Sequence, residues 1–245
     1  MIVAINQPCY LPWRGFFALM KLADVFVFYD DVQFTSNTAR SFSARVQLKT
    51  ARGKQWLTVP VQKAGRFGQR INEVAIVSGS DWQSRHARTV RDALQEAPFA
   101  SALEPVLDLV AGAPWASLAD LNVSATRHIA ESLGICPEIR LSSELGIPGR
   151  GSPRVLEICR KLGATTYLTA HGALDYLEHE AFDAAGIPVE YIDYDLAAYP
   201  QLHGAFDPYV TVLDVIANTG PAAAGHVRGT RLPWRVMQAR SEGPR

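Results

Sequence analysis

The order of patterns in the first 29 residues limits the fold more than any other feature. Ile2 to Ile5 is an uncharged apolar run that predicts a buried strand, and the β-branched and aromatic run Val25 to Tyr29 predicts a second one. Between them, turn residues precede a mostly apolar segment, residues 16–23, which predicts a short helix. A strand, a loop, a helix and a strand in this order begin a βαβ unit, so we predict an α/β protein with a parallel sheet.

Later segments repeat this alternation. Residues 165–169 and 189–192 predict strands, and residues 153–162 and 173–185 predict helices beside them. Residues 56–61 and 71–77 predict two further strands, whereas residues 81–135 have helical patterns throughout. We therefore predict a Rossmann-like, mostly parallel sheet with a helical insert. The expected parts are an N-terminal α/β part with a ligand loop (1–80), the insert (81–135), a C-terminal part completing the same domain (136–220), and a short helix with a flexible tail (221–245).

Charge and cysteine content restrict the class of protein. The 24 basic and 24 acidic side chains cancel, which argues against a protein whose main task is to bind nucleic acid. The three cysteines form no CxxC pair, as is typical of a reducing compartment. The first residues do not resemble a signal peptide, and no stretch has the roughly 18 apolar residues of a spanning helix. We expect a cytoplasmic protein without a membrane partner, and its oligomeric state stays open.

The loop Gln7 to Gly15 is the expected centre of a ligand site. Gln7 and Tyr10 can donate and accept hydrogen bonds, and Trp13 offers a flat apolar surface to a ring or a sugar. Gly15 would let a ligand approach the backbone where the helix begins. The alternative is a rigid structural turn with Trp13 in the core. Cys9 is either a thiolate near the positive end of the helix or, as for most cysteines, a packing residue.

Other reactive side chains follow the predicted strands. Asp30 and Asp31 come directly after the second strand, and His171 lies in a turn after a late strand. The carboxyl ends of strands are where α/β proteins bind ligands, so we expect these groups near the loop. Asp30 or His171 would act as a base, and the aspartates could also bind Mg²⁺. Turn-forming aspartates and a surface histidine are the alternatives.

The stretch from Arg40 to Arg70 is basic. It could contact the phosphates of a nucleotide or an RNA, although a solvated sheet edge protected by charge is the competing explanation. No ligand cluster has the spacing of a metal site, and no known phosphate-loop or hydrolase motif occurs. The cofactor is therefore unknown, with ATP and Mg²⁺ as candidates. The residues expected to contact nucleic acid are Arg40, Arg45, Lys49, Arg52 and Arg66.

Several motifs resemble one family. The run QPCYLPWRGFFALMKLADVFVFYDDVQF, followed by QWLTVPV, resembles the WbqC-like family, as do RVLEICRKLGATTYL, AGIPVEY and YPQLHGAF. The likeness spans roughly residues 2 to 220, and its first segment is the most specific. Departures at Cys9, in the stretch after Phe34, in TAHGA around His171 and in VIAN after Asp214 indicate a divergent member.

The resemblance implies a biosynthetic role. Members of the family are associated with glycan and small-metabolite synthesis, and attachment of an acyl or glycyl unit to an amine or amino sugar has been suspected. The expected catalytic residues are His171, Asp30 and Tyr10, of which Asp30 and Tyr10 match the family pattern and His171 does not. The expected substrate-binding residues are Asp31, which follows the second predicted strand, and nine residues that match the family pattern, which are Gln7, Trp13, Gly15, Gln33, Trp56, Thr58, His86, Tyr199 and Gln201.

Three functional hypotheses remain open at this point. The first is an amide-forming acyl or aminoacyl transferase acting on an amine or amino sugar, with charged tRNA as one possible donor. The second is an ATP-dependent adenylating ligase with a nucleotidyltransferase-like site. The third is a non-catalytic binding or scaffold protein of a biosynthetic assembly.

Overall fold

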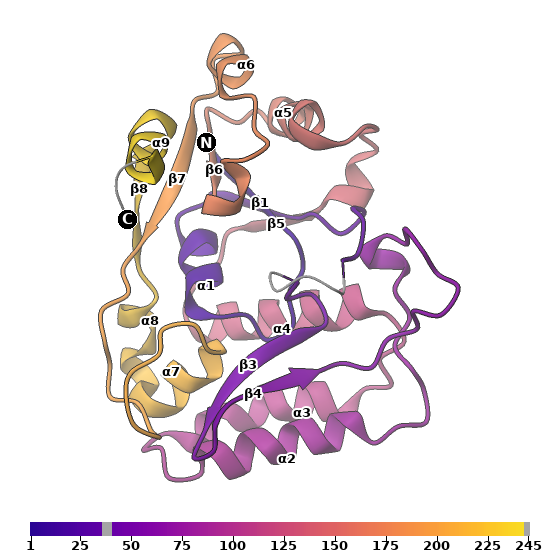
Figure 1. Cartoon of the computed structure of the whole chain (residues 1–245), viewed down its shortest axis with the longest axis vertical. Helices are drawn as coiled ribbons and strands as arrows, with labels where there is room; N and C mark the ends of the chain where they lie inside the picture. The colour runs from indigo at the N-terminus through magenta and orange to yellow at the C-terminus, as the bar shows by residue number, and fades with distance from the viewer. Residues whose placement is uncertain (36–40, 243–245) are drawn as a thin grey trace.

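A six-stranded sheet lies at the centre of the computed structural model, which describes residues 1–35 and 41–242 (Figure 1). Strand β1 pairs in parallel with both β2 and β6, whereas the last strand, β8, runs antiparallel to β7. The sequence prediction of an α/β, Rossmann-like and mostly parallel sheet is thus confirmed. In spatial order the strands are β5 (Glu138–Leu141), β2 (Val25–Phe28), β1 (Ile2–Asn6), β6 (Thr166–Thr169), β7 (Val189–Tyr194) and β8 (Gly229–Pro233).

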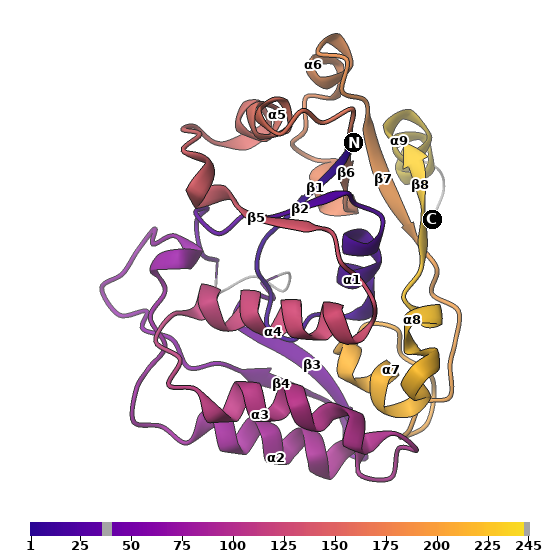
Figure 2. The same cartoon turned by 180° about the vertical axis from the view of Figure 1, so that it is seen from behind.

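Both faces of this sheet are buried under helices, which explains why its strands are apolar runs. Neighbouring residues of a strand point to opposite faces, so Val25 and Val27 join one core cluster while Phe26 and Phe28 join the other. Helices α1 (Arg14–Lys21) and α4 (Leu118–Ser132) cover the phenylalanine face. The opposite face is covered by α5 (Gly151–Lys161), α6 (His179–Ala184) and α9 (Trp234–Glu242), as Figures 1 and 2 show.

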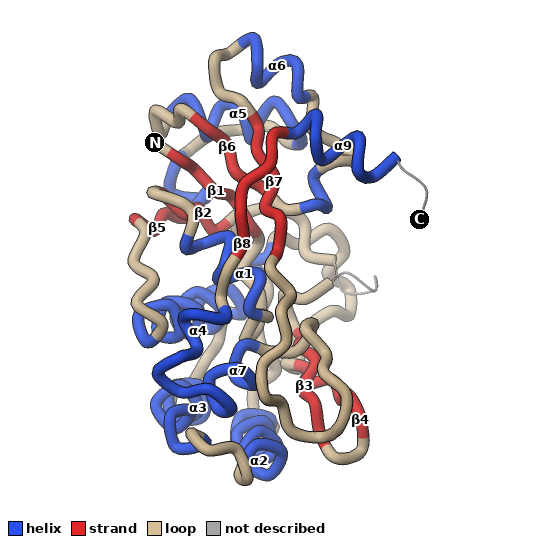
Figure 3. Tube along the Cα trace, turned by 90° about the vertical axis from the view of Figure 1, so that its left-hand side faces the viewer, coloured by secondary structure: helices blue, strands red, loops and turns tan. Residues whose placement is uncertain are grey.

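A second part of the molecule lies beyond the phenylalanine face. Here α2 (Trp82–Leu94) packs on α3 (Glu104–Gly112), and α3 packs on α4. Strands β3 (Arg45–Thr50) and β4 (Gly53–Thr58) form an antiparallel hairpin that is separate from the main sheet and contacts α2 (Figure 3). The helices α7 (Val212–Thr219) and α8 (Ala223–His226) lie beside them. Whether residues 81–135 form an independent insert stays a prediction.

Four local predictions were wrong. Residues 71–77 form no strand: Ile71–Glu73 is a 3₁₀ turn, because the Glu73 carboxylate accepts the Arg70 N–H at 2.8 Å and closes the chain locally. The strand expected at 56–61 ends at Thr58, before Pro60, which lacks a donor. Of the helix expected at residues 173–185, only the part His179–Ala184 forms an α-helix, which is α6. The tail contains strand β8 between its two short helices, and this strand pairs with β7.

Candidate functional site

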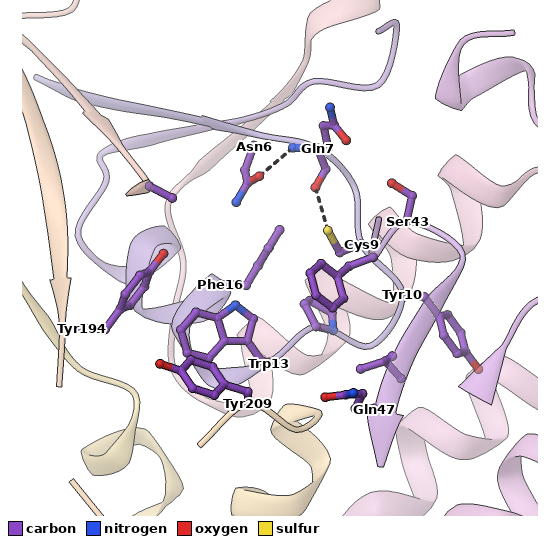
Figure 4. Close-up of a pocket in the computed structure, with 14 residues that line it drawn as sticks. Asn6, Gln7, Cys9, Tyr10, Trp13, Phe16, Ser43, Gln47, Tyr194 and Tyr209 are labelled. Carbon is purple, nitrogen blue, oxygen red and sulfur yellow. Dashed lines mark hydrogen bonds between the residues drawn. The ribbon is translucent and has the colours of Figure 1, made fainter. Parts of the chain in front are cut away.

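A cavity of about 390 Å³ opens at the carboxyl ends of the central strands. The chain runs from β1 to β2 in one direction along the sheet and from β6 to β7 in the other, so the order reverses between β1 and β6. This reversal is where open α/β sheets bind ligands. The lining residues are Asn6, Gln7, Cys9, Tyr10, Pro12, Trp13, Phe16, Phe42, Ser43, Val46, Gln47, Ala170, Tyr194 and Tyr209 (Figure 4).

The loop between β1 and α1 supplies much of this lining and is fixed from several directions. The Tyr10 N–H donates to the Phe42 carbonyl at 3.1 Å, and the Val212 N–H donates to the Pro12 carbonyl at 2.9 Å. Leu11 has a φ of 41°, which is uncommon for a residue with a side chain. The Thr211 hydroxyl, which donates to the Leu11 carbonyl at 2.8 Å, helps hold that turn. The loop is therefore a preformed wall of the pocket.

Trp13 places a flat ring in the pocket. Its indole packs beside Tyr194 and Tyr209, with ring centroids 4.8 Å and 5.4 Å away. A methyl group on Gly15 would lie 2.2 Å from the Trp13 ring, so this glycine leaves the space that the indole fills. The sequence predicted that Gly15 would give a ligand access to the backbone, but the side chain of Trp13 occupies that space.

The polar groups of the lining are uncharged. The Asn6 carbonyl Oδ1 accepts the Gln7 N–H at 2.9 Å, which orients the amide so that its NH₂ group faces the cavity in Figure 4. Ser43 and Gln47 add a hydroxyl and a second amide, and Tyr194 adds a phenol. None of the fourteen described lining residues carries a formal charge. The pocket therefore suits a neutral ligand that has both flat apolar faces and hydrogen-bonding groups.

Cys9 is a wall residue of the pocket. Its thiol donates to the Gln7 carbonyl with an S···O distance of 3.4 Å. Burial raises the pKa of this thiol to about 12, because a thiolate would be poorly solvated there. At neutral pH Cys9 is protonated, which favours its packing role over that of a nucleophile.

The buried Tyr10 and the half-buried His86 form a pair at the back of the loop. The Tyr10 hydroxyl lies 3.0 Å from His86 Nδ1, and both rings pack edge-on against Trp82. Burial, with a smaller contribution from Arg85, lowers the pKa of His86 to about 4. Burial also raises the pKa of Tyr10. The two predicted site residues thus contact each other, and the Tyr10 hydroxyl points away from the cavity (Figure 4).

Asp30 and Asp31 form a separate polar cluster next to the end of β2. The Asp30 carboxylate accepts hydrogen bonds from the Ser142 hydroxyl at 3.0 Å and from the Ser143 N–H at 3.0 Å. Asp31 forms a buried ion pair with Arg154, with an N···O distance of 2.5 Å. Burial opposes the charge of Asp31, but hydrogen bonds from Arg154 and Ser142 outweigh it and lower its pKa. Neither aspartate lines the pocket.

His171 lies just outside the pocket wall. Its neighbour Ala170 lines the cavity, while the exposed His171 ring packs 5.4 Å from Tyr194. The Nε2 atom lies 2.8 Å from the Ile192 carbonyl, which can only accept, so Nε2 carries the proton. The basic nitrogen is therefore Nδ1. The prediction of His171 and Asp30 as catalytic bases remains untested, and the structure does not bring the two side chains together in the pocket.

Tyr199 and Gln201 belong to a buried network behind the hairpin. The Tyr199 hydroxyl donates to Asp214 Oδ1 at 2.7 Å, and Gln201 Nε2 donates to the same oxygen at 2.8 Å. The Lys49 ammonium donates to Gln201 Oε1 at 2.7 Å and to the Ala205 carbonyl at 2.5 Å. Lys49 is only 5% exposed, which corrects the expectation that it faces nucleic acid.

The remaining predicted residues lie on the surface of the hairpin side. Trp56 is 41% exposed, and Thr58 and Gln33 are exposed as well. Among the expected nucleic-acid contacts, Arg52 and Arg66 are exposed and Arg45 is half-buried. Arg40 lies outside the described residues.

Sequence reasoning missed several pocket residues. Asn6 and Tyr194 are the last residues of β1 and β7, so the rule about strand ends would have found them if applied to the strands' own final residues. Gln47 lies in the hairpin strand β3, which the sequence did not indicate, and Phe42 and Ser43 lie just before that strand. Tyr209 lies in a long loop, and no local sequence pattern identifies it as a pocket residue.

In the part of the chain that the structure describes, no group of three or more His, Cys, Asp and Glu side chains is arranged to hold a metal ion. Over the same residues, every helix is too short or too polar to cross a bilayer.

The fold and the pocket define an α/β protein with a cavity at the reversal of strand order. The model of the WbqC-like protein family matches residues 7–226, and the chain belongs to this family. The chain is also 35% identical to the uncharacterized protein Rv1507c of Mycobacterium tuberculosis over 231 residues, which cover 94% of this chain and 98% of the relative. No solved structure matches the chain.

Proposed function

We propose that this protein is a biosynthetic transferase that binds an amino sugar in the pocket and forms an amide at its amine. The observation that carries the proposal is the uncharged lining, in which aromatic rings stand beside amide and hydroxyl groups. A sugar ring has C–H faces that pack on aromatic side chains such as Trp13, and hydroxyls that pair with groups such as Asn6 and Gln47. A phosphate or a carboxylate would find no cation among the described lining residues.

The same lining favours an activated acyl donor over free carboxylate and ATP. In the proposed step the amine nitrogen attacks the carbonyl carbon of an ester or thioester. A C–N bond forms, the C–O or C–S bond breaks, and the proton lost by the amine ends on the departing oxygen or sulfur. Burial disfavours an ammonium ion, so the pocket would deliver the amine in its nucleophilic neutral form. Charged tRNA and an acyl thioester are the two candidate donors.

The ATP-dependent ligase has less support. Adenylation places a triphosphate and its Mg²⁺ at the reacting carboxylate, and such groups are normally held by cationic and acidic side chains. The nearest aspartates, Asp30 and Asp31, already bind Ser142, Ser143 and Arg154. A purely binding role is the stronger second candidate, because the described pocket wall contains no acidic or histidine side chain to act as a base.

The test supplies glucosamine as acceptor with a thioester donor, with glycyl-tRNA, or with free glycine and ATP. Amide formation from either activated donor, without ATP consumption, supports the transferase. Product only with glycine and ATP, together with pyrophosphate release, would establish the ligase instead. Binding of glucosamine without turnover of any donor would favour the scaffold role.

Paired variants tie the result to the pocket. Asn6→Ala and Gln47→Ala each remove one hydrogen-bonding group, so each should weaken acceptor binding about five- to tenfold. Phe67→Ala serves as the matched control, since Phe67 is 97% exposed on a loop that does not line the pocket. Equal acceptor affinities in all three variants would show that the acceptor does not bind in this pocket.

A further inference from the structure

The outward face of the β3–β4 hairpin continues the pocket. Gln47, which lines the cavity, lies directly opposite Trp56 in the antiparallel register, and Arg45 lies opposite Thr58 on the same face. Side chains alternate along a strand, so Arg45 and Gln47 share this face while Val46 and Leu48 turn toward the interior. A ligand that leaves the pocket past Gln47 therefore meets Trp56 and Arg45 next.

This face carries an exposed aromatic platform. Phe42 and Trp56 are 43% and 41% exposed, and their ring centroids lie 6.1 Å apart at an interplanar angle of 33°. The Arg45 guanidinium lies 4.2 Å from the centre of the Trp56 ring. Phe42 also lines the cavity, so the platform and the pocket share a wall. Exposed rings combined with an arginine are typical of surfaces on which a nucleobase stacks.

The charge of this segment complements an anion. The 32 residues from Ser41 to Asn72 contain seven Lys and Arg and no Asp or Glu, although the whole chain is neutral. Arg52 and Lys54 stand at the tip of the hairpin, and Lys54 forms an ion pair with Asp207 at 2.7 Å. The uncharged pocket thus suits the neutral part of a ligand, and the basic hairpin beside it suits an anionic part of the same ligand.

We propose that the acceptor is a nucleotide-linked amino sugar, whose sugar ring enters the pocket while its nucleoside diphosphate lies on the Phe42–Trp56 platform. This inference rests on the proposed function and specifies its substrate. A single nucleotide fits better than an RNA strand, because one aromatic pair serves one base. A strand would need a longer series of rings and a strongly positive surface.

Calorimetric titrations with glucosamine, with UDP, TDP, GDP and ADP, and with UDP-glucosamine test the inference. Base stacking tolerates different bases, so we expect more than one of the diphosphates to bind. UDP-glucosamine should bind about tenfold or more tightly than glucosamine. Raising the salt concentration should weaken the diphosphates but leave glucosamine unchanged.

Trp56→Leu keeps bulk at the platform but removes the ring. It should weaken the binding of UDP-glucosamine about tenfold while the affinity for glucosamine stays constant. Phe67→Ala removes an aromatic ring elsewhere on the basic segment, and it should change neither the affinity for UDP-glucosamine nor that for glucosamine. If UDP-glucosamine and glucosamine bind equally, the nucleotide inference fails and the amino-sugar pocket stands. If the diphosphates bind and glucosamine does not, the proposed function fails instead. Tighter binding of a CCA trinucleotide than of any diphosphate would assign the platform to RNA.

Discussion

Gly15 shows how one missing side chain shapes a binding site. In a helix, alanine is normally favoured over glycine, yet a methyl group here would lie 2.2 Å from the Trp13 ring. We expect Gly15→Ala to displace the indole and to weaken ligand binding at least about tenfold, while circular dichroism shows helix content unchanged. Gly112→Ala, at the end of α3 with open space around it, is the matched control and should bind normally. Normal binding by Gly15→Ala would mean that Trp13 does not contact the ligand.

His86 should make stability depend on pH. Its folded pKa of about 4 lies below the ordinary value of 6.5, so the unfolded chain binds a proton more readily. Its contribution is complete above pH 6.5 and is lost as the pH falls toward 4, by about 2 kcal/mol after allowance for partial exposure. Urea denaturation at several pH values should show this slope. His86→Gln should flatten it between pH 6.5 and 4, and an unchanged slope would contradict a depressed pKa.

For single residues, the sequence indicates which loop forms the candidate site but not which of its side chains point into the pocket. Tyr10 lies in the loop after β1, and Tyr194 is the last residue of β7. Both tyrosines line the cavity, but Tyr10 turns its hydroxyl away from it to His86. The difference depends on packing against α2, a helix more than seventy residues away in the sequence. Cys9 has a similar explanation, since only the fold determines that its thiol is buried.

Between elements, the buried pair Asp31–Arg154 joins the end of β2 to α5. Their side chains are only 11% and 6% exposed, so loss of one partner leaves a buried charge. We expect Arg154→Met to lower the free energy of unfolding by about 3 kcal/mol. The double variant Arg154→Met, Asp31→Asn should recover part of this loss, which a double-mutant cycle in urea would measure. Strictly additive effects would show that the two side chains do not interact.

Strands were predictable from the sequence where both of their faces are buried, and not where one face is buried and the other carries polar side chains. β1 and β2 are apolar on both faces, so their sequences indicate buried strands directly. In β3, Arg45, Gln47 and Lys49 alternate with Val46 and Leu48, and the cations conceal a half-buried strand. The edge strands β5 and β8 are four and five residues long and gain their order from pairing with β2 and β7.

For the whole molecule, the pocket predicts which regions a ligand protects. Its wall combines the ends of β1, β6 and β7 with the hairpin strand β3. We expect hydrogen exchange to slow in residues 6–16 and 42–47 when glucosamine binds, because a ligand stabilises only the state that binds it. Segments on the opposite face, such as α6 and α9, should exchange at unchanged rates. Protection confined to α9 would place the ligand site on that face.

The buried Lys49 has a consequence for what the pocket can accept. Through its bonds to Gln201 and Ala205, the strand that carries Gln47 is tied to the loop that carries Tyr209. The Thr211 N–H, which donates to the Gln47 carbonyl at 2.9 Å, adds a second tie. Two segments of the pocket wall are thus held at a constant separation, independent of any occupant. A ligand therefore meets a wall whose shape is set before it binds, so binding should leave the separation between β3 and the Tyr209 loop unchanged.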